Sequence, residues 1–123
     1  MKITRFEDLK CWQNARALVA LVHETINHDT VTDIRLVDVI YKSAVTVMTA
    51  ISEGYVQPSK DESVPYITRA LSATAEVRSQ LYIALDQDYI DTDQFNALYV
   101  QANKTGKSIT AYLKILKAAG KKE

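Results

Sequence analysis

Hydrophobic residues recur along the chain at intervals of three or four positions, which is the spacing of one face of an α-helix. In the first such segment the apolar side chains are Leu9, Trp12, Ala15, Val19, Val22 and Ile26. Comparable segments follow, and together they predict helices over about residues 7–28, 33–53, 60–87 and 92–119. The alternation of apolar and polar residues that is typical of a β-strand is absent over any useful length.

Turn and capping residues separate these segments. Residues 28–33 (HDTVTD) offer N-caps for the second helix, Ser59 with Glu62 matches a capping box, and Asp91 with Gln94 resembles another. Pro65 lies several residues inside the third segment, so we expect a local irregularity there. Because the connections are short, neighbouring helices should be antiparallel. The predicted fold is an all-α, antiparallel up-and-down four-helix bundle.

The second helical segment is apolar almost all round. Its clearly polar side chains fall on one narrow stripe of the helix: Arg35, Asp38, Lys42, Thr46, Thr49 and Glu53. A helix in a small isolated bundle leaves a wider face to water, so this segment predicts a subunit interface in a homo-oligomer. The interface side chains are predicted to be Leu36, Val39, Ile40 and Val47. The alternative is that this segment is simply the most central helix of one bundle.

The 123 residues, 47% of them hydrophobic, are enough for one domain with its own core, spanning residues 1–123. The chain has one cysteine, Cys11, so no intramolecular disulfide can form, and its first ten residues lack the apolar segment of a signal peptide. No apolar stretch approaches the roughly 20 residues of a membrane span. These features predict a cytoplasmic protein without a membrane segment.

The net charge is zero, but the charges are unevenly distributed. Residues 1–100 carry 9 basic and 14 acidic side chains, whereas residues 101–123 carry 6 lysines and one acid. On a helical wheel five of these lysines form a stripe within an arc of about 140°. The stripe consists of Lys104, Lys107, Lys114, Lys117 and Lys121. It predicts binding to the phosphates of RNA or DNA, and the alternative is a solvated helix surface that needs no ligand.

The segment TVMTAISEGY (46–55) contains the most conspicuous acid of the chain, Glu53. Gly54 suits the left-handed conformation that closes a helix, so SEGY is interpreted as a C-terminal cap. A carboxylate in the last helical turn opposes the helix dipole, so we expect a partner such as Arg78, a tyrosine hydroxyl or a backbone N–H to hold Glu53. Glu76 is likewise predicted to be a buried, hydrogen-bonded acid.

The rival interpretation is a small enzyme or metal protein built on Glu53, Glu76 and His23. A di-iron bundle needs Glu-x-x-His motifs, and none occurs in the sequence. A nucleophile elbow and a Gly-rich phosphate loop are absent as well. The sequence therefore predicts no catalytic residue, no metal site and no cofactor, and it favours a non-enzymatic assembly or binding module.

Seven tyrosines are a further candidate for nucleic-acid binding. Their rings are able to stack on the bases of a single strand. Because the tyrosines are not grouped with the lysines in the sequence, the favoured interpretation is that their rings seal helix contacts and their hydroxyls lie at the edges.

Five stretches of the chain carry a further signal by their order: FEDLKCWQNAR (6–16), AISEGY (50–55), SKDE (59–62), ALSATAEVRSQLYIA (70–84) and DYI (88–90). Together they resemble the bacterial family known as the S23 or 23S rRNA intervening-sequence proteins, and the resemblance extends over nearly the whole chain. The residues that match the family motifs are Phe6, Asp8, Leu9, Trp12, Ala15, Ile51, Glu53, Gly54, Glu76 and Leu81.

The resemblance implies an up-and-down four-helix bundle, often assembled as a homopentameric ring, and it implies no established activity. The residues that it marks as a structural motif are Phe6, Asp8, Trp12, Glu53, Gly54 and Glu76. Related accessory variability proteins of diversity-generating retroelements associate with reverse transcriptase and nucleic acid. The partners suggested by the resemblance are therefore further copies of the chain, RNA or DNA, and a protein such as a reverse transcriptase.

Overall fold

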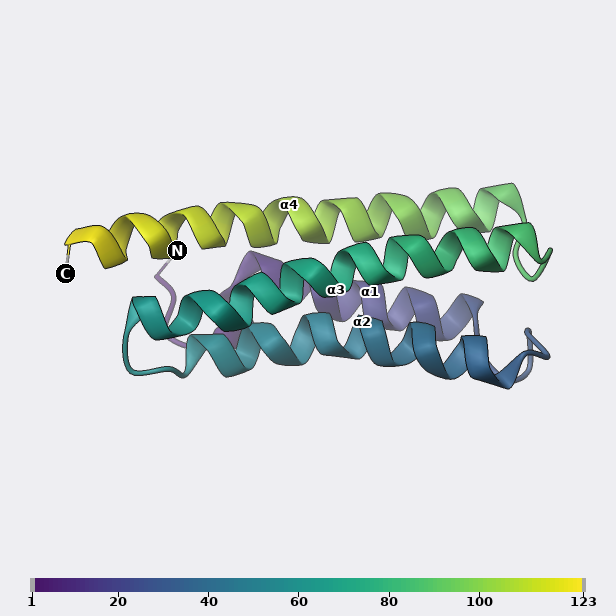
Figure 1. Ribbon diagram of the computed structural model, residues 1–123, viewed down its shortest axis with the longest axis horizontal. Coiled ribbons are helices and arrows are strands. Elements are labelled where there is room, and N and C mark those ends of the chain that lie inside the picture. The colour runs from purple at the N-terminus through teal and green to yellow at the C-terminus, as the bar shows by residue number, and fades with distance from the viewer. Residues whose placement is uncertain (1, 123) are drawn as a thin grey trace.

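The computed structural model describes residues 2–122 and the side chains of residues 2–120. One turn of 3-10 helix, η1 (Phe6–Asp8), precedes four long helices: α1 (Lys10–Thr25), α2 (Ile34–Tyr55), α3 (Lys60–Asp86) and α4 (Thr92–Lys122). No strand occurs in residues 2–122. Successive helices run in opposite directions (Figure 1), which confirms the predicted all-α four-helix bundle.

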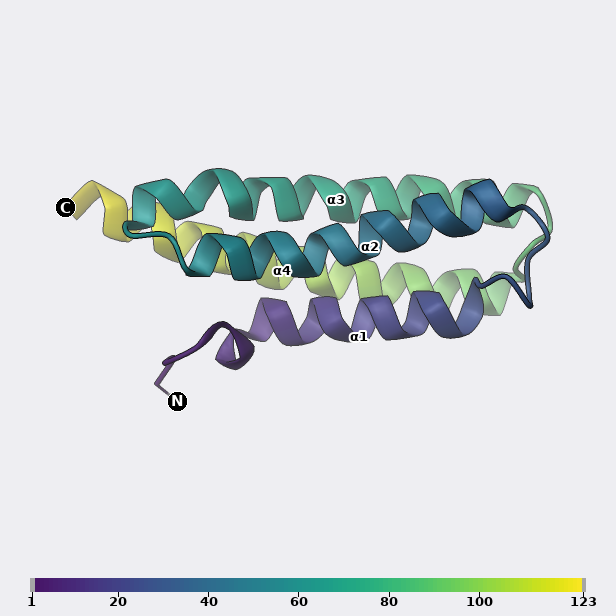
Figure 2. The same cartoon turned by 90° about the horizontal axis from the view of Figure 1, so that it is seen from below.

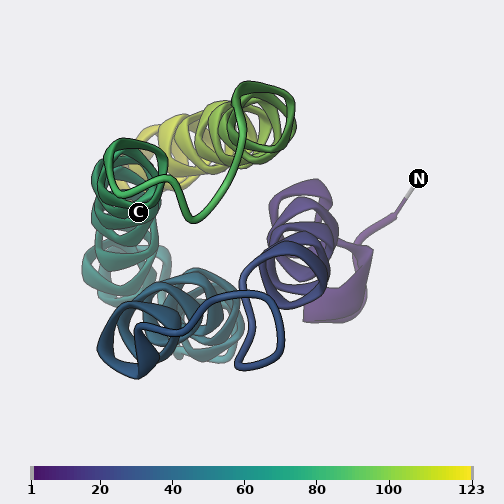
Figure 3. The same cartoon turned by 90° about the vertical axis from the view of Figure 1, so that its right-hand side faces the viewer.

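The four helices occupy the corners of a square when the bundle is viewed along its axis (Figure 3). Each packs against two neighbours: α1 and α3 both contact α2 and α4. The shortest is α1, with 16 residues, and the N-terminal segment folds against its beginning (Figure 2). The longest is α4, with 31 residues, and its last turns extend past the start of α3 (Figure 1). None of the helices described has an apolar window long enough to cross a bilayer.

The first predicted helix, over residues 7–28, is shorter in the structure because side chains bend the backbone at both ends. The Asp8 carboxylate accepts hydrogen bonds from the Thr4 N–H (3.1 Å) and from Arg5 Nε (3.3 Å), which folds the chain before Lys10 into η1. After Thr25, the Asn27 side chain accepts from the N–H groups of Asp29 (2.9 Å) and Thr30 (3.1 Å) and so forms a turn.

The predicted N-caps are present. Asp33 accepts from the Leu36 N–H at 3.3 Å, and Ser59 accepts from the Glu62 N–H at 3.1 Å. The pair before α4 is reciprocal: Asp91 Oδ1 accepts from the Gln94 N–H (2.8 Å), and Gln94 Oε1 accepts from the Asp91 N–H (2.9 Å). The irregularity expected at Pro65 does not interrupt α3, which is continuous from Lys60 to Asp86.

The core consists of two apolar clusters, one toward each end of the bundle. One holds Leu18, Ile40, Leu81 and Leu98 among its members, and the other holds Ala15, Ile51, Ile67, Ile109 and Leu116. Between the clusters lies a polar belt, made of the buried residues Asn14, Thr74, Thr105 and Gly106. The hydroxyl of Thr105 donates to the carbonyls of Asn14 (3.2 Å) and Gln101 (2.8 Å), so the belt is hydrogen-bonded within the bundle.

The expectation that Gly54 closes a helix in the left-handed conformation is wrong. Gly54 lies inside α2, which ends at Tyr55, and no glycine of the described residues has a positive φ. A Cβ atom on Gly54 would lie 2.7 Å from Ile67 Cδ1 and 3.0 Å from Tyr66 Cβ. The Gly54 carbonyl accepts from Ser63 Oγ at 2.7 Å. The glycine is therefore required by the close approach of α2 and α3.

We predict that Gly54→Ala destabilises the protein by roughly 1–3 kcal/mol, because the added Cβ must push α3 away from α2. Gly106→Ala is the matched control, because its Cβ would make ordinary contacts, 3.5 Å from Thr74 Oγ1 and 4.0 Å from Leu71 Cδ1. The control should gain up to about 1 kcal/mol from alanine's higher helix propensity. Urea unfolding of both variants measures the difference, and equal effects of the two substitutions would contradict this role of Gly54.

Cys11 is 2% exposed, and burial raises the pKa of its thiol from 9.0 to about 11. We predict that the native thiol resists disulfide reagents at pH 8 and reacts on unfolding. The unfolded chain loses this proton near pH 9 and the folded chain near pH 11, so stability is full below pH 9 and falls as the pH rises toward 11. Thermal melts between pH 8 and 11 should show a shallower decline for Cys11→Ala than for the wild type.

Candidate functional site

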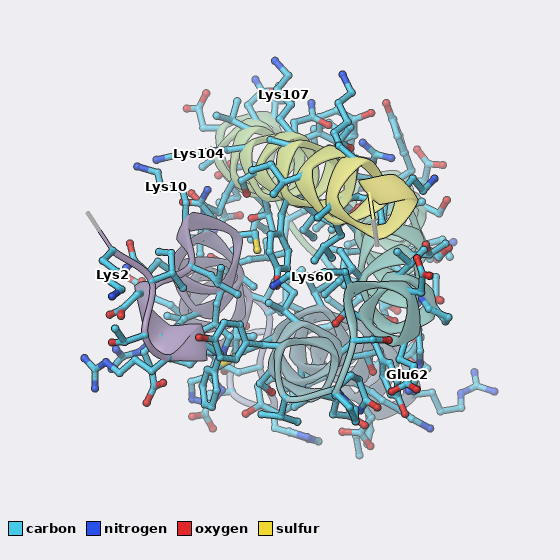
Figure 4. All side chains as sticks on the ribbon, turned by 90° about the vertical axis from the view of Figure 1, so that its left-hand side faces the viewer. Lys2, Lys10, Lys60, Glu62, Lys104 and Lys107 are labelled. Atoms are coloured by element: carbon cyan, nitrogen blue, oxygen red, sulfur yellow. The ribbon has the colours of Figure 1, made fainter. Side chains whose placement is uncertain are left out.

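The outer face of α4 carries the predicted lysine stripe. Lys104, Lys107, Lys114 and Lys117 are exposed, whereas the Lys121 side chain lies outside the described residues. Lys104 extends on the side of α1, where Lys10 also lies, and Lys107 points away from the bundle (Figure 4). Within residues 2–120, no carboxylate is within ion-pair distance of the four described amines. The stripe therefore presents positive charge that this part of the chain does not neutralise.

The contacts that α4 makes on its other faces explain why these lysines point outward. One face is buried through Leu98, Ala102, Ile109 and Leu116. On the side of α1, Asn14 Nδ2 donates to Ser108 Oγ at 3.0 Å, and Gln101 Nε2 donates to the Asn14 carbonyl at 2.9 Å. These contacts fix the rotation of α4 about its own axis, so the lysine stripe remains on the surface.

Three of the four side chains predicted for a subunit interface are covered within the chain itself. Leu36 is 8% exposed, and Ile40 and Val47 are fully buried. The prediction is wrong for these three residues, because α2 packs against α1 on one side and α3 on the other and buries them in the core of the bundle. Val39 is different: it is 48% exposed. Centrality within one bundle thus explains most of the apolar character of α2.

Val39 borders a hollow of about 380 Å³ on the outer side of the α2–α3 contact. A polar network forms part of its lining: Gln80 Nε2 donates to Ser43 Oγ at 3.0 Å, and Ser43 Oγ donates to Glu76 Oε2 at 3.3 Å. Gln80 Oε1 is buried without a hydrogen-bond partner among the described residues. Buried acceptors are normally paired, so this oxygen is an exception among the described residues.

The acids do not occupy the environments expected of them. Glu53 is exposed, and its carboxylate has no partner among the described residues; the predicted partner Arg78 donates from Nη1 to Asn103 Oδ1 (2.9 Å) instead. Glu76 is exposed rather than buried, although its predicted hydrogen bond exists, to Ser43. Both corrections have one cause: the carboxylates lie on the outer side of the helices, as the polar stripe of the second segment already indicates for Glu53.

The three groups of the enzyme or metal hypothesis are not brought together. His23 packs against the Tyr41 ring (centroids 5.9 Å apart), and it lines a hollow at the α1–α2 end of the bundle. Glu76 lines the α2–α3 hollow, and Glu53 lines neither. Among the described residues, no group of three or more His, Cys, Asp or Glu side chains is placed to hold a metal ion.

The opening motif has a structural part in the fold. The Phe6 and Trp12 rings meet edge to face, 5.3 Å apart, and the Arg16 guanidinium lies 5.9 Å from the Trp12 ring. The Thr4 N–H beside Asp8 lowers the pKa of that carboxyl. These contacts anchor the N-terminal segment on the start of α1.

Sequence reasoning named Arg78 only as a partner for Glu53 and separated the tyrosines from the lysines, so it missed the side chains that α3 contributes next to the lysine stripe. Arg78 and Tyr82 lie one turn apart on α3, and both contact α4, through Asn103 and Tyr99 respectively. The grouping depends on the alignment of two antiparallel helices and not on sequence distance. The signal that would have revealed it is a matching spacing: Arg78 and Tyr82 are four residues apart on α3, as Tyr99 and Asn103 are on α4.

The fold is similar to that of a protein with unknown function from the S23 ribosomal protein family of Bacteroides thetaiotaomicron, known from its crystal structure. The TM-score is 0.72 at 18% sequence identity, and the match covers 85% of this chain and 92% of that chain. A search among curated proteins finds no match. Residues 7–111 match the model of the 23S rRNA-intervening sequence proteins, which confirms the resemblance seen in the sequence motifs. The chain belongs to the 23S rRNA-intervening sequence protein family.

Proposed function

We propose that the protein is a non-enzymatic, homo-oligomeric module that binds nucleic acid through the lysines of α4. The observation that carries the proposal is the row of exposed lysines without carboxylate partners in the described part of the chain: Lys104, Lys107, Lys114 and Lys117. Amines of this kind bind phosphate by charge, and the counterions condensed on the nucleic acid are released when its phosphates are neutralised. RNA and DNA present phosphates in rows, which suits a row of amines along one helix.

Oligomerisation would strengthen this contact. A ring of subunits repeats the lysine stripe around its surface, and several weak contacts to one polymer add through effective concentration. Five copies is the number that the family resemblance favours. On α2, the side chain that supports such an interface is Val39, which is half exposed beside the unpaired Gln80 Oε1.

The enzyme hypothesis has less support. General acid–base catalysis needs groups that converge on one substrate, whereas His23 and Glu76 line different hollows. Glu53 lines neither of these two hollows, so it does not share one with His23 or Glu76. A role in binding requires no such convergence.

We predict that Lys107→Glu combined with Lys114→Glu weakens binding to mixed-sequence RNA and DNA. The log–log slope of affinity against salt should fall in magnitude by about 2, because each lysine contributes roughly one phosphate contact. Fluorescence anisotropy at a series of salt concentrations measures both quantities.

The matched control is Lys2→Glu combined with Lys60→Glu, which changes the net charge equally but lies outside α4. Its slope should remain close to that of the wild type. If the two double variants lose affinity equally, overall charge and not the α4 stripe is responsible. No detectable binding at low salt would reject nucleic acid as the partner and favour a protein such as a reverse transcriptase.

We predict that the wild type is a homo-oligomer and that Val39→Asp divides it, because the oligomer would bury an unpaired charge. Val56→Asp is the control, since Val56 is even more exposed (67%) but lies in the α2–α3 connection. Light scattering at tens of micromolar distinguishes the assemblies. A monomeric wild type, or an oligomer that tolerates Val39→Asp, would contradict the proposed interface.

A further inference from the structure

The contact between α3 and α4 forms a continuous seam. The two helices lie side by side along most of the bundle (Figures 1 and 3). Four pairs of residues mark the seam, each with one member on α3 and one on α4: Tyr82 and Tyr99, Arg78 and Asn103, Leu71 and Thr110, and Val64 and Lys117. In this series the residue numbers fall on α3 and rise on α4 by equal steps, as antiparallel packing requires. The outer side of the seam is therefore one track.

Arg78 supplies a fixed positive charge in the middle of this track. The side chain is partly buried, and Nη1 donates to Asn103 Oδ1 at 2.9 Å. No carboxylate of the described residues is within ion-pair distance of the guanidinium. A guanidinium held by a neutral amide keeps its charge and most of its N–H groups for another acceptor, and phosphate is one of the two acceptors, with carboxylate, that suit its planar geometry.

The polar side chains that line the hollow beside Arg78 carry hydrogen-bond donors, and no carboxylate is among them. Its volume is about 300 Å³, and its lining consists of Leu71, Arg78, Asn103, Gly106, Lys107 and Thr110. Because Asn103 Oδ1 is occupied by Arg78, the free part of that amide is its NH₂ group, which donates. The polar side chains of this hollow therefore favour an anionic group, and its apolar part is open to the rest of a ligand.

An aromatic surface follows one helical turn beyond Arg78. Tyr82 is 48% exposed, and its ring packs against Phe95 (4.9 Å between centroids) and edge to face against Tyr99 (5.8 Å). The neighbouring Tyr99 hydroxyl raises the pKa of Tyr82 above its usual value. A ring that is held in place and half exposed provides a stacking surface for a nucleobase.

We infer that the α3–α4 seam binds a single strand of nucleic acid, with phosphate at Arg78 and Lys107 and a base stacked on Tyr82. The inference rests on the proposed nucleic-acid binding of α4, and it adds the kind of strand and the residues that select it. In a duplex both faces of each base are covered by neighbouring bases, so only a single strand offers a face to Tyr82. An acidic residue lies at each end of the track: Asp86 is one turn beyond Tyr82, and Asp61 lies beside Gly120 at the other end.

The test compares a labelled oligo(U) or oligo(dT) strand with a duplex of equal length at one salt concentration. The wild type should prefer the single strand. Tyr82→Leu should weaken single-strand binding roughly ten- to hundredfold and leave duplex binding unchanged, because one stacked base is lost. Tyr82→Phe, which keeps the ring, should retain the affinity. The control is Tyr41→Leu, because Tyr41 has similar exposure (42%) but lies on α2.

Arg78→Gln tests the phosphate contact independently of the aromatic surface. Glutamine keeps a donor for Asn103 but removes the charge, so the salt slope for the single strand should fall by about 1, whereas Arg78→Lys should preserve it. Thermal melts of each variant check that the bundle is folded before binding is compared.

The outcomes separate this inference from the proposed function. Equal binding of duplex and single strand, or unchanged binding by Tyr82→Leu while the α4 lysine variant is impaired, would overturn the seam and leave nucleic-acid binding in place. Absence of binding to both forms at low salt would remove the proposed function and the seam together.

Discussion

The absence of a side chain at Gly54 determines how closely α2 and α3 approach. The space that a Cβ would fill is taken by Ile67 and Tyr66, and α3 comes close enough for Ser63 Oγ to donate to the buried Gly54 carbonyl at 2.7 Å. This contact lies one residue before the end of α2 and a few residues after the start of α3, so it holds the two helices together at their connection. The positions of α1 and α4 follow, because each packs against one member of this pair.

Directional hydrogen bonds then fix the register and rotation of the helices, which apolar contacts alone leave free. Two helices that meet only through leucine, isoleucine and alanine are able to slide or rotate at modest cost. Between α1 and α4, the Asn14 side chain and carbonyl bond to Ser108, Thr105 and Gln101. These bonds have defined lengths and partners, so they set one register and one rotation. The outward direction of the α4 lysines is thus a consequence of a polar contact on the opposite side of the helix.

The sequence predicted the four helices well because periodicity and capping are local properties. Asp33, Ser59 and Asp91 act within three residues of themselves, and the structure contains each of these caps. The candidate site was predicted only in part. The exposure of Lys104, Lys107, Lys114 and Lys117 follows from the wheel of a single helix, but Arg78 and Tyr82 join them through packing between helices. Gly54, Leu36 and Val47 were misjudged because a sequence pattern identifies an apolar or small residue without identifying the neighbour that covers it.

The division of the core by the polar belt has a consequence for how the protein opens. Because the buried apolar side chains form two distinct clusters, we expect fluctuations that expose one end of the bundle to leave the other end covered. The α3–α4 seam crosses the belt at Thr74 and Gly106, between Tyr82 at one end and Val64 at the other. A long ligand lying along the seam would contact both halves at once. Its binding energy would then oppose the opening of either half, and the two ends would open and close as one cooperative unit.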